Sequence, residues 1–261
     1  MKSFAFRQEK ILEHLRLDSF VSVSALAEEL GCSMMTVRRD LKTLEARGLL
    51  DRSHGGASAT DRIRLEFAMA ERSAAMAEEK DAIGRAAAEL VEPGQQIVIC
   101  TGTTLLAMAH HLVNHEGITV ITTSLAIVAA LLPAPRVECM LLGGLVRDTS
   151  PDLYGPLLED NLERIHPDWA FIGCDGLSVE GGLTANDPRI ARPPAIMIRN
   201  SKRTVLLTDS SKAAGDSLIS YAELKDIDIL ITDSAMPHGI LNAAREQGVE
   251  TIVVEPESNA G

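Results

Sequence analysis

Residues 34–56 read Met34-Met-Thr-Val-Arg-Arg-Asp-Leu-Lys-Thr-Leu-Glu-Ala-Arg-Gly-Leu-Leu-Asp-Arg-Ser-His-Gly-Gly56. This pattern predicts a helix that ends near Gly48, a short apolar strand and a turn at the two glycines that close the run. On a helical wheel Val37, Leu41 and Leu44 lie on one side, so this side should pack into a core. We therefore expect a helix followed by a hairpin.

The opposite side of the predicted helix is basic. Met35, Arg39, Lys42 and Ala46 lie on it, and Arg38 lies on its flank. Arginine can donate two hydrogen bonds to a guanine, and both arginine and lysine neutralise phosphate. An ordinary solvated helix would explain each cation taken singly. The prediction of a DNA-binding face therefore depends on the neighbouring elements.

Two predicted helices precede this one, over about residues 7–16 and 24–30, with an extended segment at 20–22 between them. Gly31 stops the second helix, and Ser33 is the expected N-cap of the third, so the connection is as short as a helix-turn-helix requires. The glycine hairpin adds a wing. We predict a winged helix-turn-helix that contacts double-stranded DNA through Ser33, Met35, Thr36, Arg38, Arg39, Lys42, Arg52 and His54.

Charge is distributed unevenly along the 261 residues. Residues 1–60 hold nine Lys/Arg and eight Asp/Glu, whereas the rest of the chain holds 16 and 29, within a formal net charge of −12. The acidic total argues against a protein that coats nucleic acid over its whole surface. The unevenness instead favours a small DNA-facing module joined to an acidic body.

Nothing in the sequence directs the chain to a membrane. Its start lacks a long apolar region, and no apolar stretch approaches the roughly 20 residues that a membrane span needs. The four cysteines form no C-x-x-C pair, and no His/Cys spacing suggests zinc. We expect reduced, buried thiols in a cytoplasmic protein without a metal or another cofactor.

From Gln96 onward, short apolar strands alternate with helices. This alternation predicts an α/β domain with a mainly parallel sheet that helices cover on both faces. Helices are expected at 78–90, 105–112 and 125–132. The predicted strands lie at 97–100, 120–122, 139–142, 170–173, 205–208, 229–232 and 251–254.

Four segments follow from these patterns. We predict the winged helix-turn-helix at 1–57, a linker at 58–76, an α/β effector-binding domain at 77–256 and a tail at 257–261. The linker is predicted because its residues are mostly small, polar or charged.

A second candidate site follows the first predicted strand of the α/β domain. In Cys100-Thr-Gly-Thr-Thr104, backbone N–H groups, hydroxyls and a helix dipole would favour an anion. Polar residues after the other strands should converge there, because open parallel sheets bind ligands at the carboxyl ends of their strands. A purely structural turn and an Asp209–Lys212 ion pair remain alternatives. The expected effector contacts are Thr101, Gly102, Thr103, Thr104, Ser124, Gly143, Arg147, Asp175, Thr184 and Lys212.

The first module resembles that of the DeoR family of bacterial regulators. The matching residues are Leu26-Ala-Glu-Glu-Leu30, Thr36-Val-Arg-Arg-Asp-Leu41, Leu44-Glu45, Gly48-Leu-Leu50 and Arg52-Ser-His-Gly-Gly-Ala57. The elements after the strands resemble the C-terminal domain of the same family, which is related to sugar-phosphate isomerases. The resemblance implies a repressor of a carbohydrate-metabolism operon. It further implies a dimer or tetramer on operator DNA that a phosphorylated sugar or related metabolite releases.

Two positions depart from the family pattern. The family usually has an acidic residue before the phosphate turn, where this chain has Cys100. The family also has a Glu-Ala…Lys helix, but here Pro194 stands about where the lysine is expected, and Ile190 or Arg189 replaces the glutamate. Proline disfavours a helix interior. A DNA-binding repressor that responds to no ligand is therefore one alternative.

A sugar-phosphate isomerase with an appended DNA-binding module is another alternative. It would need a positioned base and a positioned acid. Asp175, Asp209 and Lys212 are the only carriers that the sequence offers, and the Glu/Lys helix is missing. We therefore expect a regulator without catalytic residues.

Overall fold

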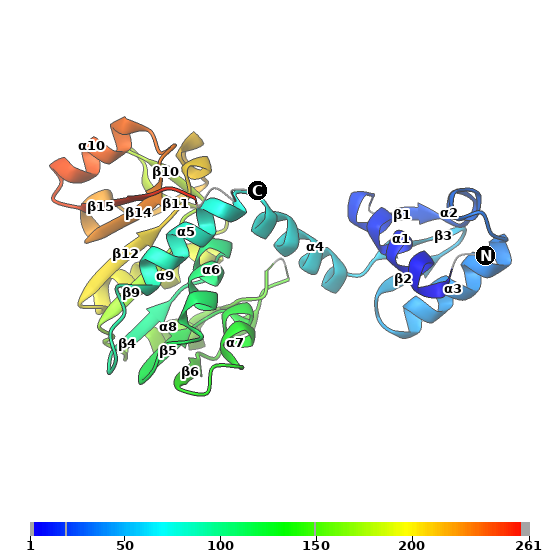
Figure 1. Cartoon of the computed structure of the whole chain (residues 1–261), viewed down its shortest axis with the longest axis horizontal. Coiled ribbons are helices and arrows are strands. Elements are labelled where there is room, and N and C mark those ends of the chain that lie inside the picture. The colour runs from blue at the N-terminus through cyan, green and yellow to red at the C-terminus, as the bar shows by residue number, and fades with distance from the viewer. Residues whose placement is uncertain (1–2, 19, 149, 257–261) are drawn as a thin grey trace. The chain divides into compact units, whose positions relative to one another are not determined.

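The computed structural model of the chain describes residues 3–18, 20–148 and 150–256, so the predicted tail lies outside the described residues. The chain divides into two units, of which the first extends to Arg72 and the second begins at Ser73 (Figure 1). Each unit has its own hydrophobic core.

The N-terminal unit has the predicted winged helix-turn-helix fold. Its helices are α1 (Phe4–Leu17), α2 (Val23–Leu30) and α3 (Met34–Ala46), and its strands are β1 (Phe20–Ser22), β2 (Leu50–Ser53) and β3 (Gly56–Ala59). β3 lies between β1 and β2 and pairs antiparallel with both, so β2 and β3 form the wing. The stripe of Val37, Leu41 and Leu44 packs into the core of this unit.

Residues 58–76, predicted as a linker, contain regular structure. β3 extends to Ala59, and helix α4 covers Asp61–Ala74. Residues 61–74 contain no glycine or proline and are rich in arginine, glutamate and alanine, which favour a helix. Most of the segment predicted as a linker is therefore helical.

A seven-stranded sheet forms the centre of the C-terminal unit. The strands lie in the order β15-β14-β12-β9-β4-β5-β6, and each neighbouring pair is parallel, as predicted. Each predicted strand is present, with slightly different ends. The strands are β4 (Gln96–Ile99), β5 (Ile118–Thr122), β6 (Val137–Leu141), β9 (Trp169–Ile172), β12 (Arg203–Leu207), β14 (Ile229–Asp233) and β15 (Glu250–Val254).

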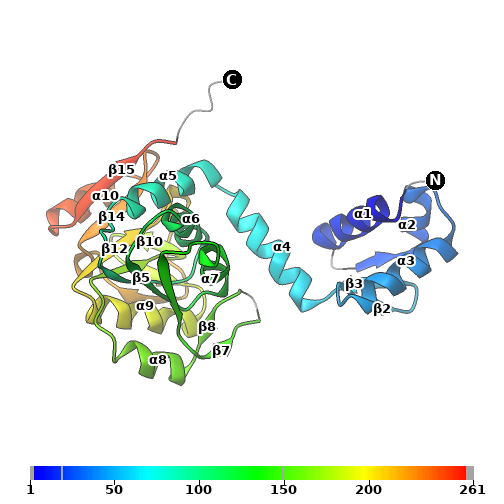
Figure 2. The ribbon, with the colours of Figure 1, turned by 60° about the horizontal axis from the view of Figure 1, so that its bottom comes forward.

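Helices cover both faces of this sheet (Figure 2). On one face α6 (Thr103–Leu112) packs between α5 (Ala77–Ala88) and α7 (Leu125–Leu131). On the other face α8 (Pro156–Leu162) packs against α9 (Pro188–Asn200), and α10 (His238–Glu246) contacts β15. Smaller elements follow several strands: β7 (Leu145–Val146), β8 (Leu153–Tyr154), β10 (Gly176–Ser178), β11 (Gly182–Ala185), β13 (Ile219–Ala222) and the 3-10 helices η1 (Ser210–Ala214) and η2 (Leu224–Asp226).

α9 is a helix although two prolines stand inside it, which corrects the expectation that Pro194 disfavours a helix here. Pro188 occupies the first turn, where a missing N–H removes no hydrogen bond. Pro193 and Pro194 deprive the carbonyls of Arg189 and Ile190 of intrahelical donors. Both prolines are buried, so packing stabilises the helix in place of these two bonds.

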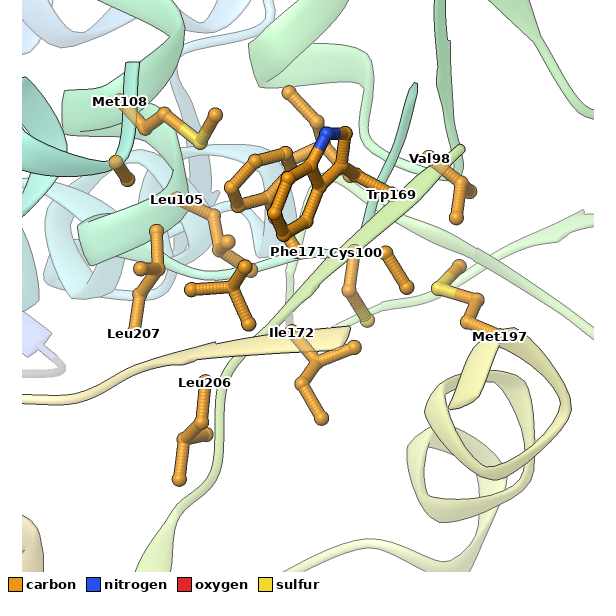
Figure 3. Close-up of a cluster of buried hydrophobic side chains, with 14 of the residues drawn as sticks. Val98, Cys100, Leu105, Met108, Trp169, Phe171, Ile172, Met197, Leu206 and Leu207 are labelled. Atoms are coloured by element: carbon orange, nitrogen blue, oxygen red, sulfur yellow. The ribbon is translucent and has the colours of Figure 1, made fainter. Parts of the chain in front are cut away.

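Aliphatic side chains build most of the core of the C-terminal unit, and one aromatic pair lies among them (Figure 3). Trp169 and Phe171 on the central strand β9 have stacked rings whose centroids lie 6.1 Å apart. Leu105 and Met108 of α6 belong to the same cluster. The turn at 101–104, which leads into α6, is thereby anchored to the centre of the sheet.

We expect Gly84→Ala to lower the free energy of unfolding of the C-terminal unit by about 1 kcal/mol. A Cβ atom at Gly84 in α5 would lie 2.5 Å from the backbone nitrogen of Met108 in α6, so the two helices would have to separate. Such overpacking costs about 1–3 kcal/mol, and the helix propensity of alanine offsets up to about 1 kcal/mol of this. Urea unfolding followed by Trp169 fluorescence measures the loss.

Gly239→Ala in α10 is the matched control. A Cβ atom at Gly239 would meet nothing within 4 Å, so this substitution should leave the free energy of unfolding unchanged or raise it. Equal losses for the two variants would contradict the close approach of α5 and α6.

Candidate nucleic-acid interface and effector site

The first turn of α3 contains a capping arrangement that uses two of the predicted DNA contacts. The Ser33 hydroxyl accepts a hydrogen bond from the Thr36 backbone N–H at 3.1 Å, and the two hydroxyl oxygens lie 3.0 Å apart. Ser33 and Thr36 therefore stabilise the start of the helix. Their hydroxyl oxygens lie within hydrogen-bonding distance of each other.

A basic hollow of about 390 Å³ lies on the exposed face of α3. We call it the basic hollow, and its lining residues are Met35, Thr36, Arg38, Arg39, Lys42 and Arg52. Met35 is 75% exposed, and the three cations of α3 are exposed as well. The structure thus brings together six of the eight residues predicted to contact DNA.

The wing continues this surface. A second hollow of about 440 Å³ includes Arg38, Arg52 and His54 in its lining, together with Glu45. The backbone N–H and the guanidinium of Arg52 both donate to the Glu45 carboxylate, at 3.3 and 3.4 Å. Glu45 therefore ties the wing to α3. The sequence does not predict this role, because the two residues are brought together only by the hairpin.

Behind the basic hollow, a buried ion pair fixes α3 to α1. Arg7 donates from Nε and Nη2 to the two carboxylate oxygens of Asp40, at 2.5 and 3.1 Å, and both side chains are 4% exposed. The hydrogen bond to Asp40 raises the pKa of Arg7 above its ordinary value, so the guanidinium stays charged. Sequence reasoning missed both residues. The one available signal is an aspartate in the otherwise apolar stripe of α3.

The predicted phosphate turn leads from β4 into α6. Gly102 is the N-cap of α6, with φ 145° and ψ 158°, a conformation open essentially to glycine alone. Thr101, Gly102 and Thr103 are partly exposed. Because the first N–H groups of a helix have no partner within it, the start of α6 can present donors to an anion.

Charged residues that follow other strands act on two thiols near this turn. The charges of Arg147 and Asp175 act on the thiol of Cys100, and those of Asp175 and Lys212 act on the thiol of Cys174. Cys100 follows β4 and Cys174 follows the adjacent β9. Three of the predicted effector residues therefore gather at the carboxyl ends of neighbouring strands.

The two thiols in this region are uncharged. Burial raises the pKa of Cys100 and the pKa of Cys174 to about 12. At Cys100 the chain thus places a neutral, buried group where the resemblance leads one to expect a carboxylate. This difference from the expected family pattern removes one negative charge from beside the turn at 101–104.

Arg147 is held between two carboxylates. Its Nε donates to Asp152 at 2.9 Å, and its Nη1 lies 3.5 Å from Asp187, with Arg147 7% exposed. Asp187 also accepts from Arg189, which lowers the pKa of Asp187 to about 2. The charge of Arg147 is therefore compensated within the protein. Its evident role is to connect the β7–β8 segment to the start of α9.

Several other predicted effector residues have internal partners. Ser124 accepts from a backbone N–H of α7 at 3.3 Å, and Thr184 donates to a backbone carbonyl of β10 at 3.1 Å. Asp175 accepts from the backbone N–H of Asn186 at 2.9 Å. Gly143, after β6, is exposed. The side chains of Ser124, Thr184 and Asp175 therefore each make a hydrogen bond within the protein.

Two buried carboxylate oxygens lack hydrogen-bond donors within the described part of the chain: Oδ2 of Asp152 and Oδ2 of Asp209. Asp209 makes no ion pair with Lys212 there, and its Oδ1 instead accepts from the Ser211 backbone N–H at 3.1 Å. A buried acceptor without a donor is costly. A hydroxyl-bearing ligand or a water molecule would supply the missing donors.

Among the residues that the structure describes, no group of three or more His, Cys, Asp or Glu side chains could hold a metal ion. None of the described helices is both long and apolar enough to cross a membrane.

Comparison with known proteins matches both units. Residues 7–62 match the DeoR-like helix-turn-helix domain, and residues 75–234 match the DeoR C terminal sensor domain. The chain is 33% identical over 247 residues to the HTH-type transcriptional repressor GlcR of Bacillus subtilis (strain 168), covering 95% of each chain. It is 28% identical over 244 residues to the glycerol-3-phosphate regulon repressor of Escherichia coli (strain K12), covering 94% of this chain and 96% of the relative. Among solved structures, ribose 5-phosphate isomerase A from Methanocaldococcus jannaschii is similar over 53% of this chain and 55% of its own, with a TM-score of 0.40 and 20% identity.

Proposed function

The chain belongs to the DeoR family of transcriptional regulators, and we propose that it represses a carbohydrate-metabolism operon in the cytoplasm until a phosphorylated sugar or a related metabolite releases it. The observation that carries the proposal is the basic hollow, with three cations of α3 and Arg52 of the wing around it. The effector is supported by the turn at 101–104, and by the phosphorylated metabolite that names the regulon of one relative.

The proposed mechanism requires two states of the protein. Release occurs only if the effector binds the state that cannot bind DNA more tightly than the state that can. We further propose that the chain acts as a homo-oligomer, a dimer or a tetramer. Closed oligomers and symmetric operators fit one another, because each half-site then receives one copy of α3.

We expect Arg38→Ala and Arg39→Ala each to weaken operator binding roughly five- to tenfold, because an exposed guanidinium in the groove loses its contacts with bases or phosphates. Genome-wide footprinting supplies the operator, and fluorescence anisotropy of a labelled duplex at about 0.15 M salt measures the dissociation constant.

The matched control for these two variants is Lys10→Ala. Lys10 is also a cation of the N-terminal unit, but it lies on α1 and pairs with Glu13. Its removal should leave the affinity for the operator almost unchanged. If both arginine variants bind as tightly as the unsubstituted chain, α3 does not present its basic face to DNA.

A ligand screen tests the effector half of the proposal. The genes beside the footprinted promoter suggest candidate metabolites, and each is compared with its unphosphorylated form by thermal shift and by release of the labelled operator. We expect stabilisation and release only with phosphorylated compounds. If none of them stabilises the protein, a repressor that responds to no ligand would be favoured. The presence of Cys100 in place of the acidic residue usual in the family is consistent with that alternative.

A further inference from the structure

One side chain in the basic hollow has no cationic or hydrogen-bonding function. Met35 is the second residue of α3, is 75% exposed, and is the one fully apolar side chain among the six that line the hollow. A large apolar side chain so exposed gains nothing from the core of its own unit. Its position among Arg38, Arg39 and Lys42 puts it where DNA would be bound.

The polar side chains beside Met35 cap the helix. The hydroxyls of Ser33 and Thr36 lie 3.0 Å apart. Of the two exposed methionines in the first turn of α3, Met35 lines the basic hollow and Met34 does not, so the methyl thioether of Met35 is the apolar group placed to meet the edge of a base. This group is flexible and polarisable, so it adapts to an apolar partner.

The major groove offers one apolar group on its base edges, the C5-methyl group of thymine. We propose that Met35 reads the C5-methyl group of a thymine in each operator half-site, while the arginines and lysine of α3 hold the surrounding phosphates and bases. This inference rests on the proposed binding of α3 to operator DNA. It assigns a specificity contact to a residue that carries no charge.

A series of modified operators tests the contact with the full-length protein. In each duplex one thymine of a half-site, with its symmetry mate, is replaced by uracil, which keeps base pairing and removes only the methyl group. We expect one position at which uracil weakens binding by the unsubstituted chain about fourfold per half-site, the effect of removing roughly one buried methyl contact.

The same duplexes are then bound by Met35→Ala and by Met35→Gln, which keeps the length of the side chain but makes it polar. Each variant should bind the duplex with thymine at that position and the duplex with uracil there equally tightly, because the thioether that contacts the methyl group has been removed. Met34→Ala is the control. Met34 is also exposed but does not line the basic hollow, so this variant should retain the fourfold preference.

Two results would overturn the contact while leaving operator binding intact. One is an unsubstituted chain that shows no uracil penalty at any thymine. The other is a penalty that Met35→Ala and Met35→Gln retain in full. A chain that binds no duplex with more than non-specific affinity would instead overturn the operator-binding proposal, and the Met35 contact with it.

Discussion

Replacing Arg7 with alanine should lower the free energy of unfolding of the N-terminal unit by about 3 kcal/mol, the lower end of the range for breaking a buried ion pair. The substitution leaves the Asp40 carboxylate without its partner at a position where its side chain is only 4% exposed. Asp40 is part of α3, so the helix that carries the basic hollow should loosen together with α1. Operator binding should fall with it.

Hydrogen exchange followed by mass spectrometry measures this effect unit by unit. Peptides from 4–17 and 34–46 should exchange much faster in Arg7→Ala, whereas peptides from the parallel sheet should not change. Replacing Arg7 and Asp40 together with leucine should restore slow exchange, because an apolar pair leaves no buried charge. An Arg7→Ala variant that exchanges as slowly as the exposed-pair variant Lys10→Ala would show that the buried pair contributes little.

The arrangement of helices and strands could be predicted because it follows from local patterns. The apolar residues of α3 recur with the helical period, which places them on one side of the helix. The short, continuous apolar runs are typical of strands buried on both faces. Ser33 as N-cap and Gly31 as helix stop are equally local, and both are present in the structure. Composition alone did not predict helix α4, and tertiary packing outweighs propensity at Pro193 and Pro194 in α9.

The partners within the two sites could not be predicted, because they depend on contacts between distant segments. Arg7 and Asp40 lie on different helices, and Glu45 meets Arg52 only across the β2–β3 wing. Arg147 illustrates the consequence: from sequence it is an available cation, whereas in the structure it is paired with Asp152 and faces Asp187. A polar residue at the end of a strand indicates where a site lies. Its partners within the protein decide whether its charge or hydrogen-bonding groups are still available to a ligand.

Gly102→Ala should produce a protein that still binds its operator but needs a much higher concentration of the proposed effector for release. The φ of 145° and ψ of 158° at Gly102 are essentially closed to alanine, and such strain costs about 1–3 kcal/mol. The turn at 101–104 would relax to another conformation, and the N–H groups at the start of α6 would no longer converge on one anion. If about 2 kcal/mol of this strain energy is lost from the free energy of effector binding, the affinity for the effector falls roughly 30-fold.

Gly248→Ala separates this effect from general strain. Gly248 also has a positive φ, of 85°, and an added Cβ there meets nothing within 4 Å. It precedes β15, at the opposite end of the parallel sheet from the turn at 101–104. Both variants are compared by thermal shift and operator release with the phosphorylated compound that stabilises the unsubstituted chain. Gly248→Ala should be released normally, and Gly102→Ala should stay on the operator at effector concentrations that release the control. Normal release of Gly102→Ala would mean that the effector does not use the start of α6, and the search for its site would move to the buried carboxylates of Asp152 and Asp209.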